Sequence, residues 1–164
     1  MANIEFARHR RLRQNSGIRA LVRETKVSAD DFIYPIFIAA GNNVKNEIRS
    51  MPGIYQFSLD NLLPEVEEAV NLGIKAIILF GVPFEEEKDE VGTGAFSHNG
   101  LVQQGTKLIK EKFPDVLVIA DTCLCEYTDH GHCGLVENGE IVNDASLEYL
   151  VKTAVSQAEA GADI

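Results

Sequence analysis

Three cysteines and two histidines lie close together in one short stretch of the sequence, DTCLCEYTDHGHCG, which spans residues 121–134. All the cysteines of the 164-residue chain are in this stretch, at Cys123, Cys125 and Cys133. Thiolates bind soft ions such as Zn²⁺, and nearby glycines allow the chain to fold back so that the third sulfur can reach the other two. Three protein ligands leave one tetrahedral position open, so the spacing predicts a catalytic metal site rather than a structural one.

The net charge of such a site indicates its chemistry. Three thiolates around one Zn²⁺ leave a charge of about −1, so the ion acidifies a bound water less than an ion held by three neutral imidazoles. We therefore expect the metal to act mainly as a Lewis acid that binds and orients an amine or a carbonyl of a substrate. Asp121 precedes the cysteines and could hold an ammonium group or organise bound water.

Other interpretations of the same residues stay open. A closed structural site would use His130 or His132 as a fourth ligand. Three buried cysteines could also pack as small apolar side chains, although the polar neighbours Glu126 and Asp129 argue against that. A redox dithiol is disfavoured because the C-x-x-C spacing is missing.

The composition is that of an ordinary globular protein, with 45% hydrophobic and 24% charged residues. The sequence has no apolar run of about 18 residues that could cross a membrane. Its first residues also lack the apolar stretch of a secretory signal, so we expect a cytoplasmic protein. In a reducing cytoplasm, an odd number of clustered cysteines favours metal binding or catalysis over disulfides.

Positive charge is concentrated near the start of the chain. Residues 6–23 contain no acidic residue and six arginines: Arg8, Arg10, Arg11, Arg13, Arg19 and Arg23. Removing these six charges from the net charge of −10 leaves −16 on the remainder. An acidic body disfavours nucleic acid as a partner, whereas a basic arm could dock on a neighbouring copy of the protein. Apolar residues in the arm, such as Phe6 and Leu12, favour docking over a frayed, solvated terminus.

Three short apolar runs, at residues 31–40, 75–82 and 115–121, predict strands that are buried on both faces of a sheet. Residues 162–164 resemble the opening of a fourth strand. The chain between the runs shows helical spacing of apolar residues, which alternates with the strands and therefore predicts βαβ units and a parallel sheet.

Three helices are predicted from these patterns. The first covers about 59–72 and ends at Gly73, with Pro64 favouring a start near residue 63. The second covers 101–112 and ends before Pro114. The third carries an apolar stripe that ends at Gly161 and consists of Leu147, Leu150, Val151, Ala154 and Ala158.

The two long connections, residues 83–98 and 122–144, both follow predicted strands. They therefore leave the carboxyl ends of the strands, where α/β folds place their binding sites. Within the first connection, residues 84–92 are expected to form a solvated charged loop and residues 92–96 a turn. Three strands and the start of a fourth cannot close a parallel barrel of about eight strands. The chain is then either a small open sheet or half of something longer.

The cysteine loop resembles the zinc loop of the porphobilinogen synthase family, also called delta-aminolevulinic acid dehydratase. Other stretches that resemble this family are RALVRET (19–25), FIYPIFIAAG (32–41), SMPGIYQFS (50–58), KDEVGTGAF (88–96), NGLVQQ (99–104), ENGEIVNDASLEYL (137–150) and AEAGADI (158–164). The resemblance runs along nearly the whole chain.

This resemblance implies an α/β fold of the (β/α)₈ TIM barrel family. Residues 1–30 would form an N-terminal arm that embraces a neighbouring subunit, commonly within a homo-octamer. Residues 31–164 would form the N-terminal half of the barrel, with about three βα units and the start of strand 4. The implied activity is that of a lyase, which condenses two 5-aminolevulinate molecules to porphobilinogen with loss of water, early in tetrapyrrole and heme biosynthesis.

The resemblance also implies roles for individual residues. Cys123, Cys125 and Cys133 would hold the active-site zinc, and Asp121 would face the substrate amino group. His132 matches a position that contributes to a second metal in some members. The lysines that form Schiff bases with substrate, and the usual ligands of an allosteric Mg²⁺, lie on later strands of family members.

The chain has eight lysines, and none of them matches a Schiff-base position of the family: Lys26, Lys45, Lys75, Lys88, Lys107, Lys110, Lys112 and Lys152. We therefore expect the isolated 164-residue chain to be inactive, and to be poorly soluble because open parallel edges invite association. The alternative is a non-catalytic zinc-binding α/β module that assembles through its basic arm.

Overall fold

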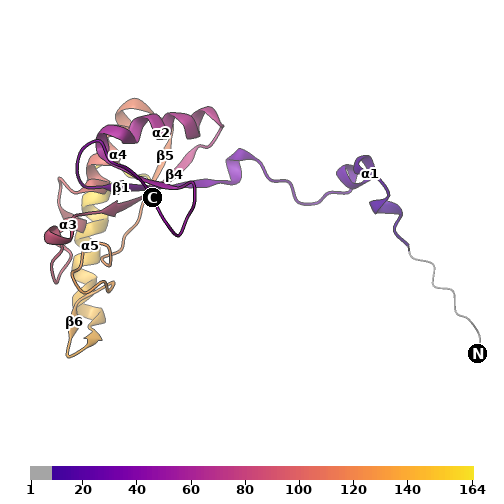
Figure 1. Ribbon diagram of the computed structural model, residues 1–164. Helices are drawn as coiled ribbons and strands as arrows, with labels where there is room; N and C mark the ends of the chain where they lie inside the picture. Colours follow the sequence, from indigo (N-terminus) through magenta and orange to yellow (C-terminus); the bar gives the residue numbers. More distant parts are fainter. Residues whose placement is uncertain (1–8) are drawn as a thin grey trace, which may run out of the picture.

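A five-stranded sheet is the centre of the fold in the computed structural model, which describes residues 9–164 (Figure 1). The strands are β1 (Ile33–Ala39), β2 (Lys45–Glu47), β3 (Tyr55–Phe57), β4 (Ala76–Val82) and β5 (Leu117–Ala120). Their order is β2-β3-β1-β4-β5, and every pairing is parallel except that of β2 with β3. The three predicted strands and the parallel sheet are confirmed, whereas the short β2–β3 pair was not predicted.

Three longer helices follow strands β3, β4 and β5 along the chain. They are α2 (Leu59–Asn71), α4 (Leu101–Lys112) and α5 (Asn143–Glu159). The short elements are the helices α1 (Ser16–Leu21) and α3 (Thr93–Phe96), the 3₁₀ turns η1 (Arg11–Arg13), η2 (Ala29–Asp31) and η3 (Glu85–Glu87), and the hairpin strands β6 (Val136–Glu137) and β7 (Glu140–Ile141). None of the helices described between residues 9 and 164 is both long and apolar enough to cross a membrane.

Helix α2 corrects one prediction from the sequence. It begins at Leu59 rather than near residue 63, and Pro64 lies inside it. A proline within a helix removes one backbone hydrogen bond. The helix nevertheless continues through this position because Leu62 and Val66, on either side of the proline, are both fully buried in the core.

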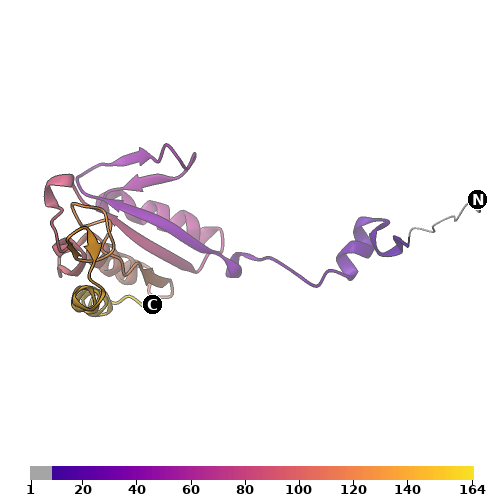
Figure 2. The same cartoon turned by 90° about the horizontal axis from the view of Figure 1, so that it is seen from below.

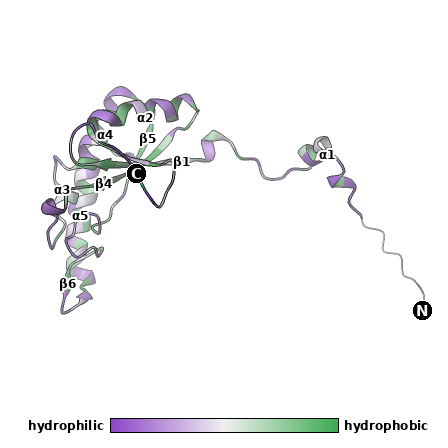
Figure 3. Ribbon diagram, viewed as in Figure 1, coloured by the Kyte–Doolittle hydropathy of each residue, from purple (hydrophilic) through white to green (hydrophobic). Residues whose placement is uncertain are grey.

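One face of the sheet is covered by α2 and α4, and the apolar core lies there. Ile36 and Ile38 of β1 alternate with less buried residues, as expected for a strand with one face on the core. The same alternation occurs in β4. The residues that pack together in this core are Ile36, Ile38, Phe57, Leu62, Val66, Ile77, Leu79, Val102, Ile109, Val116, Val118 and Ala120. Figure 3 shows the apolar colour concentrated on these strands.

The opposite face of the sheet carries apolar side chains that are only half-buried. Phe37 and Phe80 are adjacent in the register of β1 and β4, and their rings stack with centroids 5.2 Å apart. Ile78 and Ile119 are paired on β4 and β5 and lie on the same face. This second face is therefore apolar but less covered than the first, so the prediction of strands buried on both faces is not met in this chain.

The last residues of the chain extend the sheet beyond β5. The Asp163 amide donates to the Val118 carbonyl at 2.8 Å, and the Ala120 amide donates to the Ile164 carbonyl at 2.9 Å. The Asp163 carboxylate also accepts from the Val118 amide at 2.8 Å and contacts Lys110 Nζ at 3.0 Å. These parallel-type contacts agree with the predicted opening of a fourth strand.

Helix α5, seen end-on in Figure 2, packs on α3 and α4. Of its predicted apolar stripe, only Leu150 packs against the small buried cluster that contains Ala95 and Leu124. Leu147 and Val151, two members of the predicted stripe, are 50% and 61% exposed. The buried residues within the helix are instead Ser146, Thr153, Ser156 and Gln157. The helix was predicted from the apolar spacing, but that spacing does not identify the face that is buried in this chain.

Within the predicted arm of residues 1–30, the described residues 9–30 extend away from the sheet (Figure 1). Its helix α1 begins after Asn15, whose side chain accepts a hydrogen bond from the Ile18 amide at 2.9 Å. Leu21 is 87% exposed. Phe6 and Arg8 of the predicted arm lie outside the described residues.

Candidate metal centre

The cysteine loop starts where β5 ends, at the carboxyl edge of the parallel strands. The Asp121 amide still donates to the Leu79 carbonyl of β4, at 3.2 Å. After this contact the chain leaves the sheet, and Leu124 and Tyr127 pack with Ala95 in a small buried cluster. The Tyr127 ring lies so close to Gly81 of β4 that a Cβ atom at that glycine would collide with its hydroxyl. Two buried side chains thus fix the first half of the loop.

The long connection after β4 supports the cysteine loop from the side. The Asp89 amide donates to the Tyr127 carbonyl at 3.3 Å, and the Asp129 amide donates to the Asp89 carbonyl at 3.0 Å. The Asp89 carboxylate in turn accepts from the amides of Val91 and Thr93. Residues 84–92, predicted as a solvated charged loop, are therefore in part a structural support for the candidate site.

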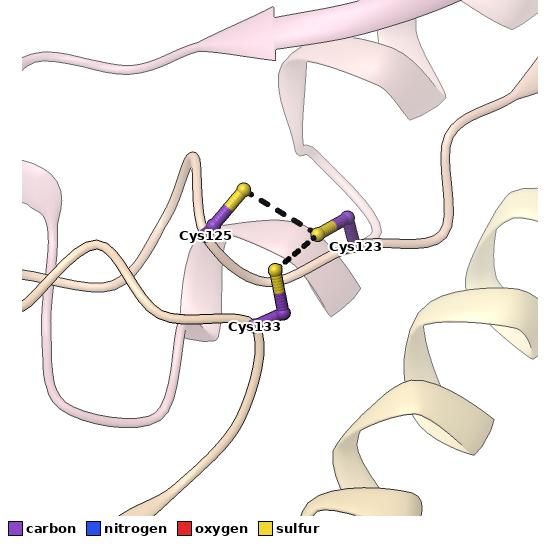
Figure 4. Close-up of side chains that lie close together, drawn as sticks. All are labelled: Cys123, Cys125 and Cys133. Atoms are coloured by element: carbon purple, nitrogen blue, oxygen red, sulfur yellow. Dashed lines mark hydrogen bonds between the residues drawn. The ribbon is translucent and has the colours of Figure 1, made fainter. Parts of the chain in front are cut away.

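The three cysteine sulfurs converge on one another, as Figure 4 shows. Cys123 Sγ lies 3.4 Å from Cys125 Sγ and 3.2 Å from Cys133 Sγ, and all three sulfurs lie within 4.8 Å of one another. Sulfurs that share a tetrahedral zinc at bond lengths of about 2.3 Å lie about 3.8 Å apart. The observed spacing fits one such ion, so the residues present can hold a soft divalent metal.

The local environment disfavours thiolates when no cation is bound. Burial raises the pKa of the Cys125 thiol to about 12, and the neighbouring Cys123 and Cys133 add to this effect. Burial also raises the pKa of the Cys123 thiol. A divalent cation reverses the preference because it binds the deprotonated sulfurs. Metal binding at this site must therefore release protons.

Two carboxylates accompany the sulfurs. Strand alternation places Asp121 on the half-buried face of the sheet, on the same side as Ile119 and Phe80. Burial raises the pKa of the Asp121 carboxyl. Burial, followed by the charge of Asp121, raises the pKa of Glu126 to about 7. The sequence identified Glu126 only as a polar neighbour, because its burial depends on how the loop folds.

The two histidines lie outside the sulfur cluster. In the range 9–164, the close group of candidate metal ligands contains only the three cysteines. His130 Nδ1 accepts from the His132 amide at 3.1 Å, so its Nε2 carries the proton and donates to the Glu90 carbonyl at 3.2 Å. The rings of His130 and His132 stack 5.5 Å apart. Neither histidine therefore belongs to the sulfur cluster, which argues against the closed structural site with a histidine as fourth ligand.

Sequence reasoning missed Gln157 of α5 as a residue close to the site. Its side chain contacts Asp121 and Thr122, which directly precede Cys123. No motif marks a glutamine 34 residues after a cysteine. The only available signal was the interruption of the apolar pattern in the third helix by polar residues.

Comparison with known proteins assigns the chain to a family. The family model described as delta-aminolevulinic acid dehydratase matches residues 6–164. A protein of that name from Halalkalibacterium halodurans is 60% identical over 99% of this chain and 49% of its own length. A protein of the same name from Staphylococcus epidermidis is 55% identical over 98% of this chain and 50% of its own length. The chain thus spans about half the length of these relatives.

A solved structure shares the fold. The crystal structure of delta-aminolevulinic acid dehydratase (porphobilinogen synthase) from Toxoplasma gondii ME49, in complex with the reaction product porphobilinogen, superposes with a TM-score of 0.91 at 40% sequence identity. The match covers 98% of this chain and 46% of that chain. The parallel α/β arrangement described above is therefore that of a part of a larger structure.

Proposed function

The chain belongs to the delta-aminolevulinic acid dehydratase family, and we propose that it provides the metal-binding part of a porphobilinogen synthase. The proposed reaction is the condensation of two 5-aminolevulinate molecules to porphobilinogen with loss of water, a lyase reaction of tetrapyrrole and heme biosynthesis. The names of the relatives support this, as does the product bound in the Toxoplasma gondii structure.

The observation that carries the proposal is the convergence of three sulfurs at the carboxyl end of β5. We propose that Cys123, Cys125 and Cys133 hold one zinc ion and leave its fourth position to a substrate. When bound, zinc supplies a Lewis acid that stabilises charge on a substrate amine or carbonyl group. Asp121 faces the ammonium group of that substrate, which its carboxylate orients by charge and hydrogen bonding.

The proposed surroundings of the site are those of a (β/α)₈ barrel. Residues 31–164 form its N-terminal half, and the half-buried sheet face with Phe37 and Phe80 becomes part of its interior. Residues 1–30 form an arm that grips a neighbouring subunit, within a homo-octamer. The exposed Leu21 and the arginines of the arm support this role, because an arm without a partner would leave apolar side chains in water.

The covalent chemistry of the reaction needs groups that this chain does not supply. A Schiff-base lysine is activated by removal from water in a pocket. Lys45 and Lys75 are exposed, and Lys75 forms an ion pair with Asp30 at 2.7 Å. None of the eight lysines is buried, and all eight lie within the described residues. We propose that the 164-residue chain alone is inactive and prone to association, and that the lysines come from the second half of the enzyme.

Three further assignments belong to the same proposal. His132, whose exposed imidazole stacks on His130, contributes to a second metal site. An allosteric Mg²⁺ binds outside the segment present here. The enzyme works in the cytoplasm, where its thiols stay reduced.

A chimeric enzyme tests the proposal. Residues 1–164 would be joined to the remaining half of the Halalkalibacterium halodurans relative, and porphobilinogen formation would be measured with and without zinc. We expect zinc-dependent activity from the chimera, at least about 100-fold less from its Cys133→Ser variant, and none from the 164-residue chain alone. A chimera that folds and binds zinc but forms no porphobilinogen would favour the non-catalytic zinc-binding module instead.

A further inference from the structure

The buried polar face of α5 contacts the cysteine loop near both ends of the loop. Ser146 is near the start of the helix and Gln157 is near its end, and each is 4% exposed. Buried polar groups are stable only when they are hydrogen-bonded. The partners of these two side chains therefore show what the polar face contacts.

Gln157 holds the beginning of the loop with both ends of its carboxamide. Its Nε2 donates to the Asp121 carbonyl at 2.7 Å. Its Oε1 accepts from the Thr122 hydroxyl at 2.9 Å. A planar amide that bonds to two consecutive residues fixes both the position and the direction of the chain. The next residue is Cys123, the sulfur that lies close to both of the others.

Ser146 holds the end of the loop. Its hydroxyl accepts from the Leu135 amide at 2.9 Å and donates to the Val142 carbonyl at 2.6 Å. Gly134 lies so close to this hydroxyl that a Cβ atom at that position would collide with it. Cys133 directly precedes this glycine. One helix therefore fixes the chain on both sides of the three sulfurs.

We propose that Gln157 is a positioning residue of the metal centre: it fixes Asp121 and Thr122 so that Cys123 Sγ is held at bonding distance from an ion shared with the other two cysteines. The inference rests on the proposed metal site. Partners that orient a metal site without touching the ion are worth about 10–100-fold in metal affinity. Gln157 acts through backbone and hydroxyl groups rather than through a ligand atom, so its expected effect is about tenfold, at the lower end of that range.

The opposing explanation is that Gln157 only packs α5 against the sheet. Gln103 provides a matched control for this, because its carboxamide is also buried between helices. Its Nε2 donates to the Ala95 carbonyl and to the Ser156 hydroxyl, both at 2.8 Å. It stabilises the contact of α4 with α5, but none of its hydrogen bonds reaches the cysteine loop.

The experiment compares Gln157→Leu with Gln103→Leu in the chimeric chain that joins residues 1–164 to the remaining half of the Halalkalibacterium halodurans relative. Cobalt(II) affinity is measured by chelator competition, the sulfur-to-cobalt charge-transfer bands by absorption, and the Tm by thermal melting without metal. We expect Gln157→Leu to bind cobalt about tenfold more weakly with altered bands, and Gln103→Leu to lower Tm while its affinity stays within about twofold. Equal cobalt affinities for Gln157→Leu and the unmodified chain would overturn the inference.

A second pair of variants decides the question if Gln157→Leu does not fold. Thr122 is exposed, so Thr122→Val removes one contact of Gln157 with little effect on folding. We expect a loss of about threefold in cobalt affinity, and normal affinity for Thr122→Ser, which keeps the hydroxyl. No loss for Thr122→Val would contradict the inference. Failure of the proposed metal site is distinguishable, because the unmodified chain would then bind no cobalt through its cysteines.

Discussion

Helices α4 and α5 both follow a strand and pack beside each other, but α4 buries apolar as well as polar side chains, whereas the buried residues within α5 are all polar. Helix α4 places Val102 and Ile109 in the apolar core under the sheet. Helix α5 places Ser156 and Gln157 inward and leaves Val155 half exposed. The first kind of contact stabilises the fold without directional demands, whereas the second orients particular backbone groups. The contrast separates the part of the chain that stabilises the sheet from the part that holds the metal site.

The largest effect on stability is expected on the α4 side. Ile109→Ala removes a fully buried side chain from the centre of the core. The free energy of unfolding should fall by about 2–5 kcal/mol, from lost burial and the cavity left behind. Urea denaturation measures this loss. A change below about 1 kcal/mol would show that the α4 contact contributes less than its burial indicates.

The next largest effect is expected on metal binding rather than on stability. Cys133→Ser replaces an exposed sulfur ligand with a poorer one, so zinc affinity should fall at least about 100-fold, equivalent to about 2.7 kcal/mol. Thermal melting without metal should hardly change. His132→Ala is the matched control from the same loop, and its affinity at the cysteines should stay within about twofold. Equal losses for the two variants would contradict an all-sulfur site.

A smaller effect is expected where α4 meets the end of the chain. The hydrogen bond from the Val118 amide and the charge of Lys110 hold the pKa of the Asp163 carboxyl below its ordinary value. The stabilisation is therefore present above the unfolded pKa of about 3.9, and is lost as the pH falls through the lower folded value. Because the side chains of Lys110 and Asp163 are 26% and 33% exposed, solvent screens the pair and its contribution should be about 1 kcal/mol.

The Asp163→Asn variant measures this contribution. Its stability deficit in urea should be largest at neutral pH. It should shrink below about pH 4, because the carboxyl is protonated first in the unfolded chain and, at still lower pH, in the native protein. A deficit that is constant from neutral pH down to about pH 3 would show that the carboxylate charge is not the cause.

The smallest effect is expected on the outer face of α5. Val155→Ala removes a side chain that is 50% exposed, so the stability of the 164-residue chain should change by less than about 0.5 kcal/mol. The comparison with Ile109→Ala uses the same denaturation measurement. A loss of about 2 kcal/mol for Val155→Ala would mean that the outer face of α5 is buried in solution.

Pattern and spacing were sufficient to predict much of the fold. The apolar runs of β1, β4 and β5 have no strict alternation, which is typical of parallel strands, and their positions predicted the carboxyl edge where the cysteine loop begins. The β2–β3 pair was missed because both strands are only three residues long, and β2 contains Lys45, Asn46 and Glu47. Three-residue strands of this composition have no readable period.

The sequence was sufficient to predict the types of the metal ligands, but not the residues that hold the cysteine loop in place. Two cysteines at a spacing of two and a third beyond a glycine suffice to predict a sulfur cluster. Several contacts that fix the cluster connect residues far apart in the sequence, such as Gln157 with Asp121, 36 positions apart, and His130 with Glu90, 40 positions apart. Periodicity describes which face of a helix is apolar, but it cannot tell whether that face or the polar one meets a neighbouring loop.

X-ray absorption at the zinc edge of the zinc-loaded chain tests the central claim most directly. We expect one zinc per chain with three sulfur neighbours at about 2.3 Å and a single oxygen or nitrogen neighbour that exchanges with added ligand. A fourth neighbour that comes from His130 or His132, or fewer than three sulfurs at the ion, would contradict it.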